Sequence, residues 1–95
     1  MTSEMAVHAR VHGRVQGVAF REHTRREARR LGLVGWVRNR VDGTVEVWGE
    51  GPATQLKQLL DWLAIGSPFS HVTQVEYTEA SAEGMGAGFE IRSTL

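Results

Sequence analysis

Hydrophobic and polar residues alternate along residues 6–12, the first strongly patterned segment of the chain. Val7, Ala9 and Val11 fall on one side of this segment, and a histidine or an arginine follows each of them. A period of two residues is typical of a β-strand with one buried face. The pattern therefore predicts a strand that ends at Gly13.

Residues 20–31 have the spacing of a helix, although the apolar stripe is thin. The recurring positions are Phe20, Thr24, Glu27 or Ala28, and Leu31. Arginines and acids fill the remaining positions, and Gly32 is a suitable residue just past a helix end. We predict a helix with a narrow buried face.

A second helix is predicted after Pro52, a residue that suits a first helical turn. The stripe follows the i, i+3, i+4, i+7 pattern of an amphipathic helix, at Leu56, Leu59, Leu60 and Leu63. Gly66 and Pro68 follow the last leucine and end the helix.

Two β-rich segments, residues 33–40 and 44–50, flank the pair Asp42-Gly43. This pair favours the positive φ angles of a type I′ turn, so the segments are predicted to form a hairpin. Val45 and Val47 should face the core, and positions 44, 46, 48 and 50 should face away from it.

The remaining segments are two strands and the loop between them. Residues 72–77 are predicted as a strand, and Phe89 and Ile91 alternate in a last short strand. The small, glycine-rich residues 80–88 between them are predicted to form a mobile loop.

The predicted order is strand, helix, strand, strand, helix, strand and a short terminal strand. This order predicts an α+β fold, the ferredoxin-like split β-α-β sandwich, with an antiparallel sheet and two helices on one face. The 95 residues suffice for one domain, residues 1–95, of which residues 1–5 are expected to be flexible.

Charge is unevenly distributed, although the formal net charge is zero. Nine of the ten arginines lie in residues 10–40, and the first forty residues contain three acids, Glu4, Glu22 and Glu27. A basic first half favours an anionic ligand, whereas the structural alternative is a solvated arginine face on one helix.

Composition narrows the possible chemistry. The chain has no cysteine, which excludes disulfides and thiolate chemistry. The histidines at positions 8, 12, 23 and 71 do not have the spacing of a metal site, so no metal or cofactor is expected. Residues 1–5 lack the apolar run of a signal peptide, and no segment is long and apolar enough to span a bilayer. A soluble cytoplasmic protein without a membrane partner is expected.

Residues 13–21 join the first strand to the first helix and are the strongest candidate for a binding site. Gly13 and Gly17 allow a tight turn whose amides a ligand can approach. Inward-facing N–H groups and a helix N-terminus attract anions, and Arg21 can add a bidentate guanidinium. The loop could therefore hold phosphate, although a tight turn without a ligand is the commoner use of such a pattern.

Two motifs give this chain a specific resemblance. Residues 11–21 read Val-x-Gly-x-Val-Gln-Gly-Val-x-Phe-Arg, and residues 35–39 read Gly-Trp-Val-Arg-Asn. Asp42-Gly43-x-Val45 and Gly51 follow the second motif. Between the two motifs, the usual spacing is matched by Ala28, Leu31, Gly32 and Leu33. Over residues 7–91 the chain resembles the acylphosphatase family, whose fold agrees with the predicted element order.

The resemblance implies a role for each matching residue. Arg21 and the amides of Val15, Gln16, Gly17 and Val18 would bind the substrate phosphate, and Asn39 would orient the attacking water. Ala19 and residues 84–88 occupy positions where the family varies, so they would affect stability or substrate preference. Without the motif, Asn39 would be interpreted as a structural residue near a turn.

The implied reaction is hydrolysis of an acyl phosphate to a carboxylate and inorganic phosphate. The departing carboxylate has a conjugate acid with a pKa of roughly 4 to 5, so it needs no general acid. Phosphoryl transfer then requires mainly positioning and charge stabilisation, which agrees with the lack of a metal cluster. We expect a metal-independent monomer that inorganic phosphate, its product, inhibits.

Two other functions fit a ferredoxin-like fold. A nucleic-acid-binding module would carry clustered aromatic residues on its two central strands, but the first strand offers only valine, alanine, histidine and arginine, so no nucleic-acid partner is expected. A non-catalytic domain that senses or passes on carbamoyl phosphate is the other alternative. The presence of both Arg21 and Asn39 favours an enzyme.

Overall fold

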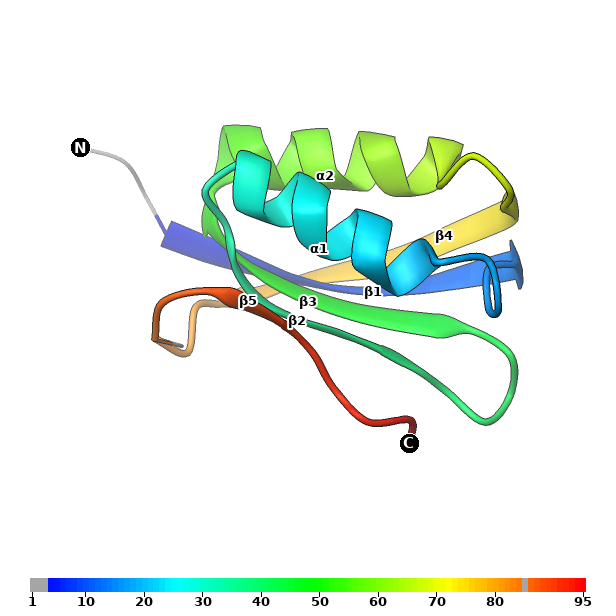
Figure 1. The fold of residues 1–95 in the computed structure, drawn as a ribbon. Helices are drawn as coiled ribbons and strands as arrows, with labels where there is room; N and C mark the ends of the chain where they lie inside the picture. The colour runs from blue at the N-terminus through cyan, green and yellow to red at the C-terminus, as the bar shows by residue number, and fades with distance from the viewer. Residues whose placement is uncertain (1–3, 85) are drawn as a thin grey trace.

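The computed structural model describes residues 4–84 and 86–95 of the chain. Its elements are β1 (Glu4–Arg14), α1 (Phe20–Arg30), β2 (Val34–Asn39), β3 (Val45–Pro52), α2 (Ala53–Ile65), β4 (His71–Ser81) and β5 (Phe89–Ile91). This is the element order that the hydrophobic pattern predicts. Both helices lie on one face of the sheet (Figure 1).

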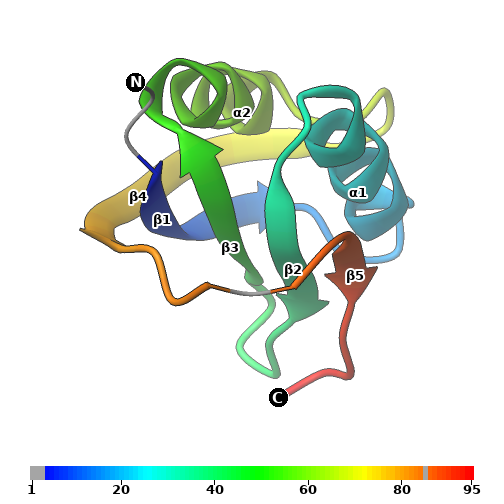
Figure 2. The same ribbon diagram turned by 90° about the vertical axis from the view of Figure 1, so that its left-hand side faces the viewer.

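The sheet has the strand order β4-β1-β3-β2-β5, which Figure 2 shows nearly end-on. The three pairings among the first four strands are antiparallel, as expected for the ferredoxin-like α+β fold. The short β5 pairs with β2 in parallel, so the sheet as a whole is mixed. The predicted fold class is confirmed, with a parallel strand at one edge.

The core lies between the sheet and the two helices. Val7, Ala9 and Val11 of β1 and Val45 and Val47 of β3 are buried there, as the alternation predicts. The helices contribute the predicted positions Phe20, Ala28, Leu56, Leu59 and Leu63 to the same cluster. Burial of these apolar side chains is the main force that holds helices and sheet together.

The hairpin between β2 and β3 is confirmed, but its turn is not of type I′. The amide of Gly43 donates to the carbonyl of Arg40, and the amide of Arg40 donates to the carbonyl of Thr44. Gly43 has φ 93°, whereas Asp42 does not have a positive φ. Val41 and Asp42 therefore form the centre of the turn and Gly43 follows it, which is the three-residue hairpin connection.

Strand β4 is longer than predicted, because it pairs with β1 as far as Ser81, opposite Met5. Two residues of the predicted loop 80–88 therefore belong to a strand. Glu83 and Gly84 of the same loop donate backbone hydrogen bonds to the Glu50 carboxylate, and residue 85 lies outside the described residues. At the other terminus, Glu4 and Met5 begin β1, while residues 1–3 of the expected flexible segment lie outside the described residues.

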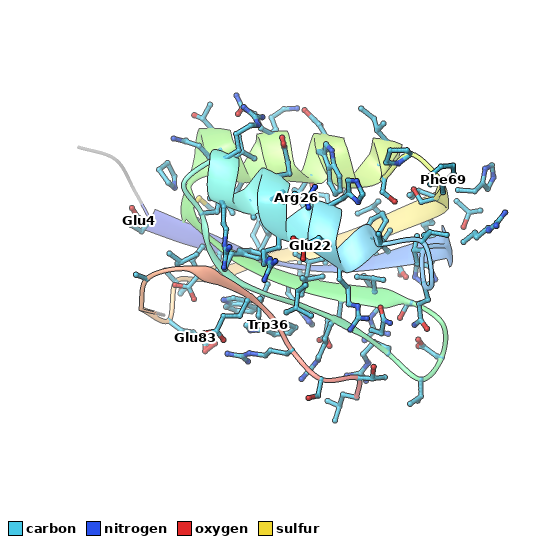
Figure 3. The ribbon with its side chains drawn as sticks, viewed as in Figure 1. Glu4, Glu22, Arg26, Trp36, Phe69 and Glu83 are labelled. Carbon is cyan, nitrogen blue, oxygen red and sulfur yellow. The ribbon has the colours of Figure 1, made fainter. Side chains whose placement is uncertain are left out.

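The sheet face opposite the helices carries polar groups that the sequence pattern places in solvent. Glu46 and Glu50 of β3 are nevertheless 5% and 3% exposed. The Glu46 carboxylate pairs with Arg38, Arg40 and His8, and Trp36 lies on this face beneath Arg38 (Figure 3). His8 of β1 and Arg38 of β2 cover the Glu46 carboxylate, because cross-strand neighbours on one face contact each other. The Glu50 carboxylate accepts a hydrogen bond from the indole of Trp48.

Candidate active site

Residues 15–19 form the turn between β1 and the N-terminus of α1. Gly17 has φ 73°, and Ala19, which precedes the helix, has φ 58°. A non-glycine residue in this left-handed region is uncommon, so the bend at Ala19 is a specific local conformation that the sequence did not reveal. Together the two residues turn the chain sharply between β1 and α1.

The amides of this turn are available to a ligand. None of the backbone hydrogen bonds that hold the described loops and helix ends has an amide of residues 15–19 as its donor. No described side chain caps the N-terminus of α1, whose first intrahelical bond runs from the amide of His23 to the carbonyl of Ala19. Free amides and the positive end of a helix together favour an anion.

The role of Gly13 in the structure differs from the predicted one. A Cβ atom at this position would lie 2.1 Å from the carbonyl oxygen of His71 in β4. The register of β1 against β4 also shifts between His12 and Gly13. Gly13 therefore allows two backbones to approach closely, rather than allowing a ligand to approach.

A pocket of about 160 Å³ brings the two predicted motifs together. Its lining residues are Val15, Gly17, Ala19, Phe20, Arg21, Glu22, Asn39 and Ile91. Arg21 comes from the first turn of α1 and Asn39 from the last position of β2. Four of the six predicted site residues, including both that were predicted to be catalytic, therefore border one small concave site.

The other two predicted residues, Gln16 and Val18, do not line this pocket with their side chains. Val18 packs against the hydrophobic core. The Gln16 side chain turns towards the β2–β3 hairpin, where its Nε2 donates to the carbonyls of Arg40 and Thr44 at 2.7 and 2.9 Å. Their predicted contribution comes from the backbone amides, so it does not require the side chains to enter the pocket.

Arg21 has no carboxylate partner among the described residues, unlike most of the other arginines. The ion pairs are Arg10–Asp42, Arg25–Glu22, Arg26–Glu22, Arg30–Glu27, Arg38–Glu46 and Arg40–Glu46. Three of these pairs lie along α1, in agreement with the solvated-face interpretation of its arginines. Arg21 is half-buried and free to bind an anion that enters the pocket.

Glu22 is a pocket residue that sequence reasoning did not select. Arg25 donates two hydrogen bonds to the Glu22 carboxylate, each 2.6 Å long, and Arg26 adds an ion pair on the outer side of α1 (Figure 3). The hydrogen bonds from Arg25 and the nearby arginine charges lower the pKa of Glu22 against the effect of desolvation. Glu22 is therefore ionised at neutral pH.

Asn39 has one unsatisfied polar atom. Its side-chain Oδ1 is buried and has no hydrogen-bond partner in the described part of the chain. A buried acceptor without a donor costs free energy unless a water or ligand satisfies it. The Asn39 backbone is fixed, since its carbonyl accepts a hydrogen bond from the amide of Leu95, which lies beyond β5. Sequence reasoning did not select Ile91 or Leu95, because their contribution depends on the parallel pairing of β5.

A larger concavity lies elsewhere on the molecule. A pocket of about 490 Å³ lies between α2 and β4, and its lining includes Leu56, Leu60, Val75 and Tyr77. None of its lining residues belongs to either predicted motif, and Lys57 is its only cation. The smaller pocket has the chemistry that an anionic ligand requires.

Across residues 4–84 and 86–95, no three histidine, aspartate or glutamate side chains are grouped so that they could bind a metal ion. No helix among the described residues combines the length and the apolar character needed to cross a bilayer.

Comparison with known proteins agrees with the two motifs. The acylphosphatase family model matches residues 7–91. An acylphosphatase from Thiobacillus denitrificans (strain ATCC 25259 / T1) is 49% identical over 87 residues, covering 92% of this chain and 96% of the relative.

Solved structures agree as well. The crystal structure of acylphosphatase from Bacillus subtilis matches with a TM-score of 0.89 and 44% identity, covering 93% of this chain and 98% of that one. An acylphosphatase structure from Coxiella burnetii matches with a TM-score of 0.90 and 38% identity, covering 95% and 94%. Because sequence and structure match over nearly the whole chain, this chain belongs to the acylphosphatase family of hydrolases.

Proposed function

We propose that this chain hydrolyses the carboxyl–phosphate bond of acyl phosphates in the pocket shared by Arg21 and Asn39. One observation carries the proposal: among the described residues, a guanidinium without a carboxylate partner, a loop whose amides make no backbone hydrogen bond and the side-chain amide of Asn39 meet at the same small pocket. The first two suit a phosphate dianion, and the third suits a water molecule. The products are a carboxylate and inorganic phosphate.

The phosphate is held by backbone and side-chain donors together. The amides of Val15, Gln16, Gly17 and Val18 donate to its oxygens, and the N-terminus of α1 adds partial positive charge. The planar guanidinium of Arg21 donates two parallel hydrogen bonds. These donors also stabilise the negative charge that is spread over the phosphoryl oxygens in the transition state.

The attacking water is oriented by Asn39. The side-chain amide of Asn39 forms a hydrogen bond with the water, whose oxygen then faces the phosphorus atom opposite the leaving carboxylate. The water oxygen forms the new P–O bond, and the bond from phosphorus to the carboxyl oxygen breaks, with its electron pair leaving on the carboxylate. The water proton passes to an oxygen of the phosphate itself.

No protein acid is needed in this scheme. Glu22 borders the pocket, but its lowered pKa keeps it ionised, so it is a poor proton donor at neutral pH. A carboxylate leaves readily without protonation because its conjugate acid is already strong. The mechanism therefore relies on positioning and electrostatics, which the pocket supplies from fixed backbone and side-chain groups.

The same proposal includes a monomeric cytoplasmic enzyme that needs no metal ion or cofactor. Chelator treatment followed by dialysis should leave its rate unchanged. An enzyme that lost activity under this treatment, and regained it with a divalent ion, would require a different mechanism.

The direct test is hydrolysis of a panel of acyl phosphates, such as acetyl, benzoyl and carbamoyl phosphate, with phosphate release as the readout. An alkyl phosphate monoester is the matched substrate control, because its alkoxide leaving group needs a proton that this site does not supply. We expect turnover of the acyl phosphates only. Hydrolysis of the monoester at a comparable rate, or no turnover of any acyl phosphate by the folded protein, would refute the proposal.

A further inference from the structure

The side chain of Gln16 links two parts of the chain that meet at the pocket. Its Nε2 atom donates to the carbonyl of Arg40 at 2.7 Å and to the carbonyl of Thr44 at 2.9 Å. Arg40 follows β2 and Thr44 precedes β3, and the amide of Arg40 also donates to the Thr44 carbonyl. One primary amide therefore bridges both strands of the hairpin where they separate into the turn.

The bridge crosses between the two sides of the pocket. Val15 and Gly17, the immediate neighbours of Gln16, line the pocket from the loop. Asn39, the immediate neighbour of Arg40, lines it from the hairpin. The loop and the hairpin turn lie at the same end of the sheet (Figure 1). The hydrogen bond from Gln16 to Arg40 therefore joins the loop that is proposed to bind phosphate to the residue that follows Asn39.

Other contacts of the hairpin do not make this connection. The carboxylate of Asp42 accepts hydrogen bonds from the amide and the hydroxyl of Thr44, which lie within the same turn. The carbonyl of Asn39 accepts from the amide of Leu95, which ties it to the segment after β5. Among the described residues, Gln16 makes the only side-chain hydrogen bonds between residues 15–19 and the hairpin.

We propose that the Gln16 side chain is a positioning residue, which sets the distance between the phosphate held by the loop and the water held by Asn39. This inference rests on the proposed function. In-line attack requires the water oxygen to lie about 3 to 3.5 Å from the reacting atom, and misplacement by about 1 Å can cost about 10²-fold in rate. The phosphate and the water are held by different segments, so a fixed link between these segments controls that distance.

Two substitutions remove the link without removing the phosphate-binding amide, because the backbone of residue 16 stays in place. Gln16→Met preserves the approximate volume, and Gln16→Glu preserves the shape but cannot donate to a carbonyl when ionised. For Gln16→Met we expect kcat to fall about 10- to 100-fold. KM and the inhibition constant for inorganic phosphate should stay within about threefold of the wild-type values, because ground-state phosphate binding is retained.

A double-mutant cycle with Asn39→Ala distinguishes positioning from general stabilisation. If Gln16 acts through Asn39, Gln16→Met should lower kcat by less than about threefold in the Asn39→Ala protein, since no oriented water remains to be displaced. An equal loss of kcat in both backgrounds would overturn the positioning role while leaving the proposed function intact. A wild-type kcat for Asn39→Ala alone would overturn both.

Asp42→Ala is the matched control variant. It removes two hydrogen bonds within the same hairpin and one from Arg10 of β1, but none that reaches residues 15–19. We expect a lower unfolding midpoint and a kcat within about threefold of wild type. The positioning role is wrong if Asp42→Ala lowers kcat as much as Gln16→Met, or if both folded Gln16 variants keep wild-type kcat. Circular dichroism of each variant checks that the fold is retained.

Discussion

Arg21, in the first turn of α1, and Asn39, at the end of β2, border one pocket of about 160 Å³. The guanidinium has no carboxylate partner in the described residues, and the Oδ1 of Asn39 has no hydrogen-bond donor there. In the proposed function, Arg21 binds the phosphate and Asn39 binds the water. Substitutions at these two positions should accordingly change different kinetic parameters.

Arg21→Lys should severely reduce the activity although it keeps the positive charge. A lysine ammonium cannot donate the two parallel hydrogen bonds of a guanidinium. We expect kcat/KM to fall by at least about 10²- to 10³-fold, the typical loss for one transition-state donor, together with weaker inhibition by phosphate. Steady-state kinetics measures both effects. A folded variant within tenfold of wild type would mean that Arg21 is not the main phosphate ligand.

Asn39→Ala should separate chemistry from binding. The loop amides and Arg21 stay in place, so KM and the phosphate inhibition constant should change little. We expect kcat to fall about 10²- to 10³-fold, because the lost hydrogen bond orients the attacking water and does not hold the phosphate. Circular dichroism and the denaturation midpoint must stay near wild type, since Asn39 precedes the hairpin turn. A raised KM with an unchanged kcat would instead identify Asn39 as a binding residue.

Inorganic phosphate should inhibit competitively, because product and substrate phosphate occupy the same donors. Sulfate has a similar shape and charge and should inhibit in the same way, equally or more weakly. Initial rates at several substrate and phosphate concentrations provide the test. Purely non-competitive inhibition would indicate that the anion binds outside the substrate site.

Because of Glu46, the free energy of unfolding should depend on pH in the acid range. Burial raises the pKa of this carboxyl. Hydrogen bonds from Arg38 and His8, together with their charges, lower the pKa by more than burial raises it, so the net pKa lies below the ordinary value. A carboxyl with a lowered folded-state pKa contributes stability above its unfolded pKa and loses it as pH falls through the folded pKa. Glu46→Gln should therefore lower the free energy of unfolding at pH 7 by about 1–3 kcal/mol.

The difference between wild type and Glu46→Gln should be smaller at pH 3 than at pH 7, as urea unfolding at both pH values would measure. Glu90→Gln is a suitable control, because Glu90 is exposed and has no ion pair in the described part of the chain. Its effect should be small at both pH values. A difference for Glu46→Gln that is the same at pH 7 and pH 3 would contradict the linkage.

Local patterns were sufficient to predict the elements and the fold class. The alternation in residues 6–12 and the leucines of α2 are each repeated within a few residues, so they report which face is buried without knowledge of distant neighbours. The roles of Arg21 and Asn39 were predicted differently, from the resemblance of two short motifs to the acylphosphatase family.

Strand ends and turn type depended on distant pairing. Residues 78–81 of β4 are mostly exposed and have little hydrophobic signal, yet they extend the strand because the backbone of β1 is available beside them. Asp42-Gly43 predicted a hairpin, but the register of β2 against β3 placed Val41 and Asp42 at the turn centre and Gly43 after it.

The arrangement of the site was decided only by the tertiary structure. The sequence by itself predicted an anion-binding loop at residues 13–21, because residue type and local backbone preference are properties of short segments, and the resemblance to the acylphosphatase family predicted a catalytic role for residues 35–39. Packing of the loop against the hairpin brings the Gln16 side chain to Arg40 and buries the Asn39 Oδ1, which has no hydrogen-bond partner among residues 4–84 and 86–95. Such contacts join residues far apart in the chain, and their geometry exists only once the sheet and helices have packed together.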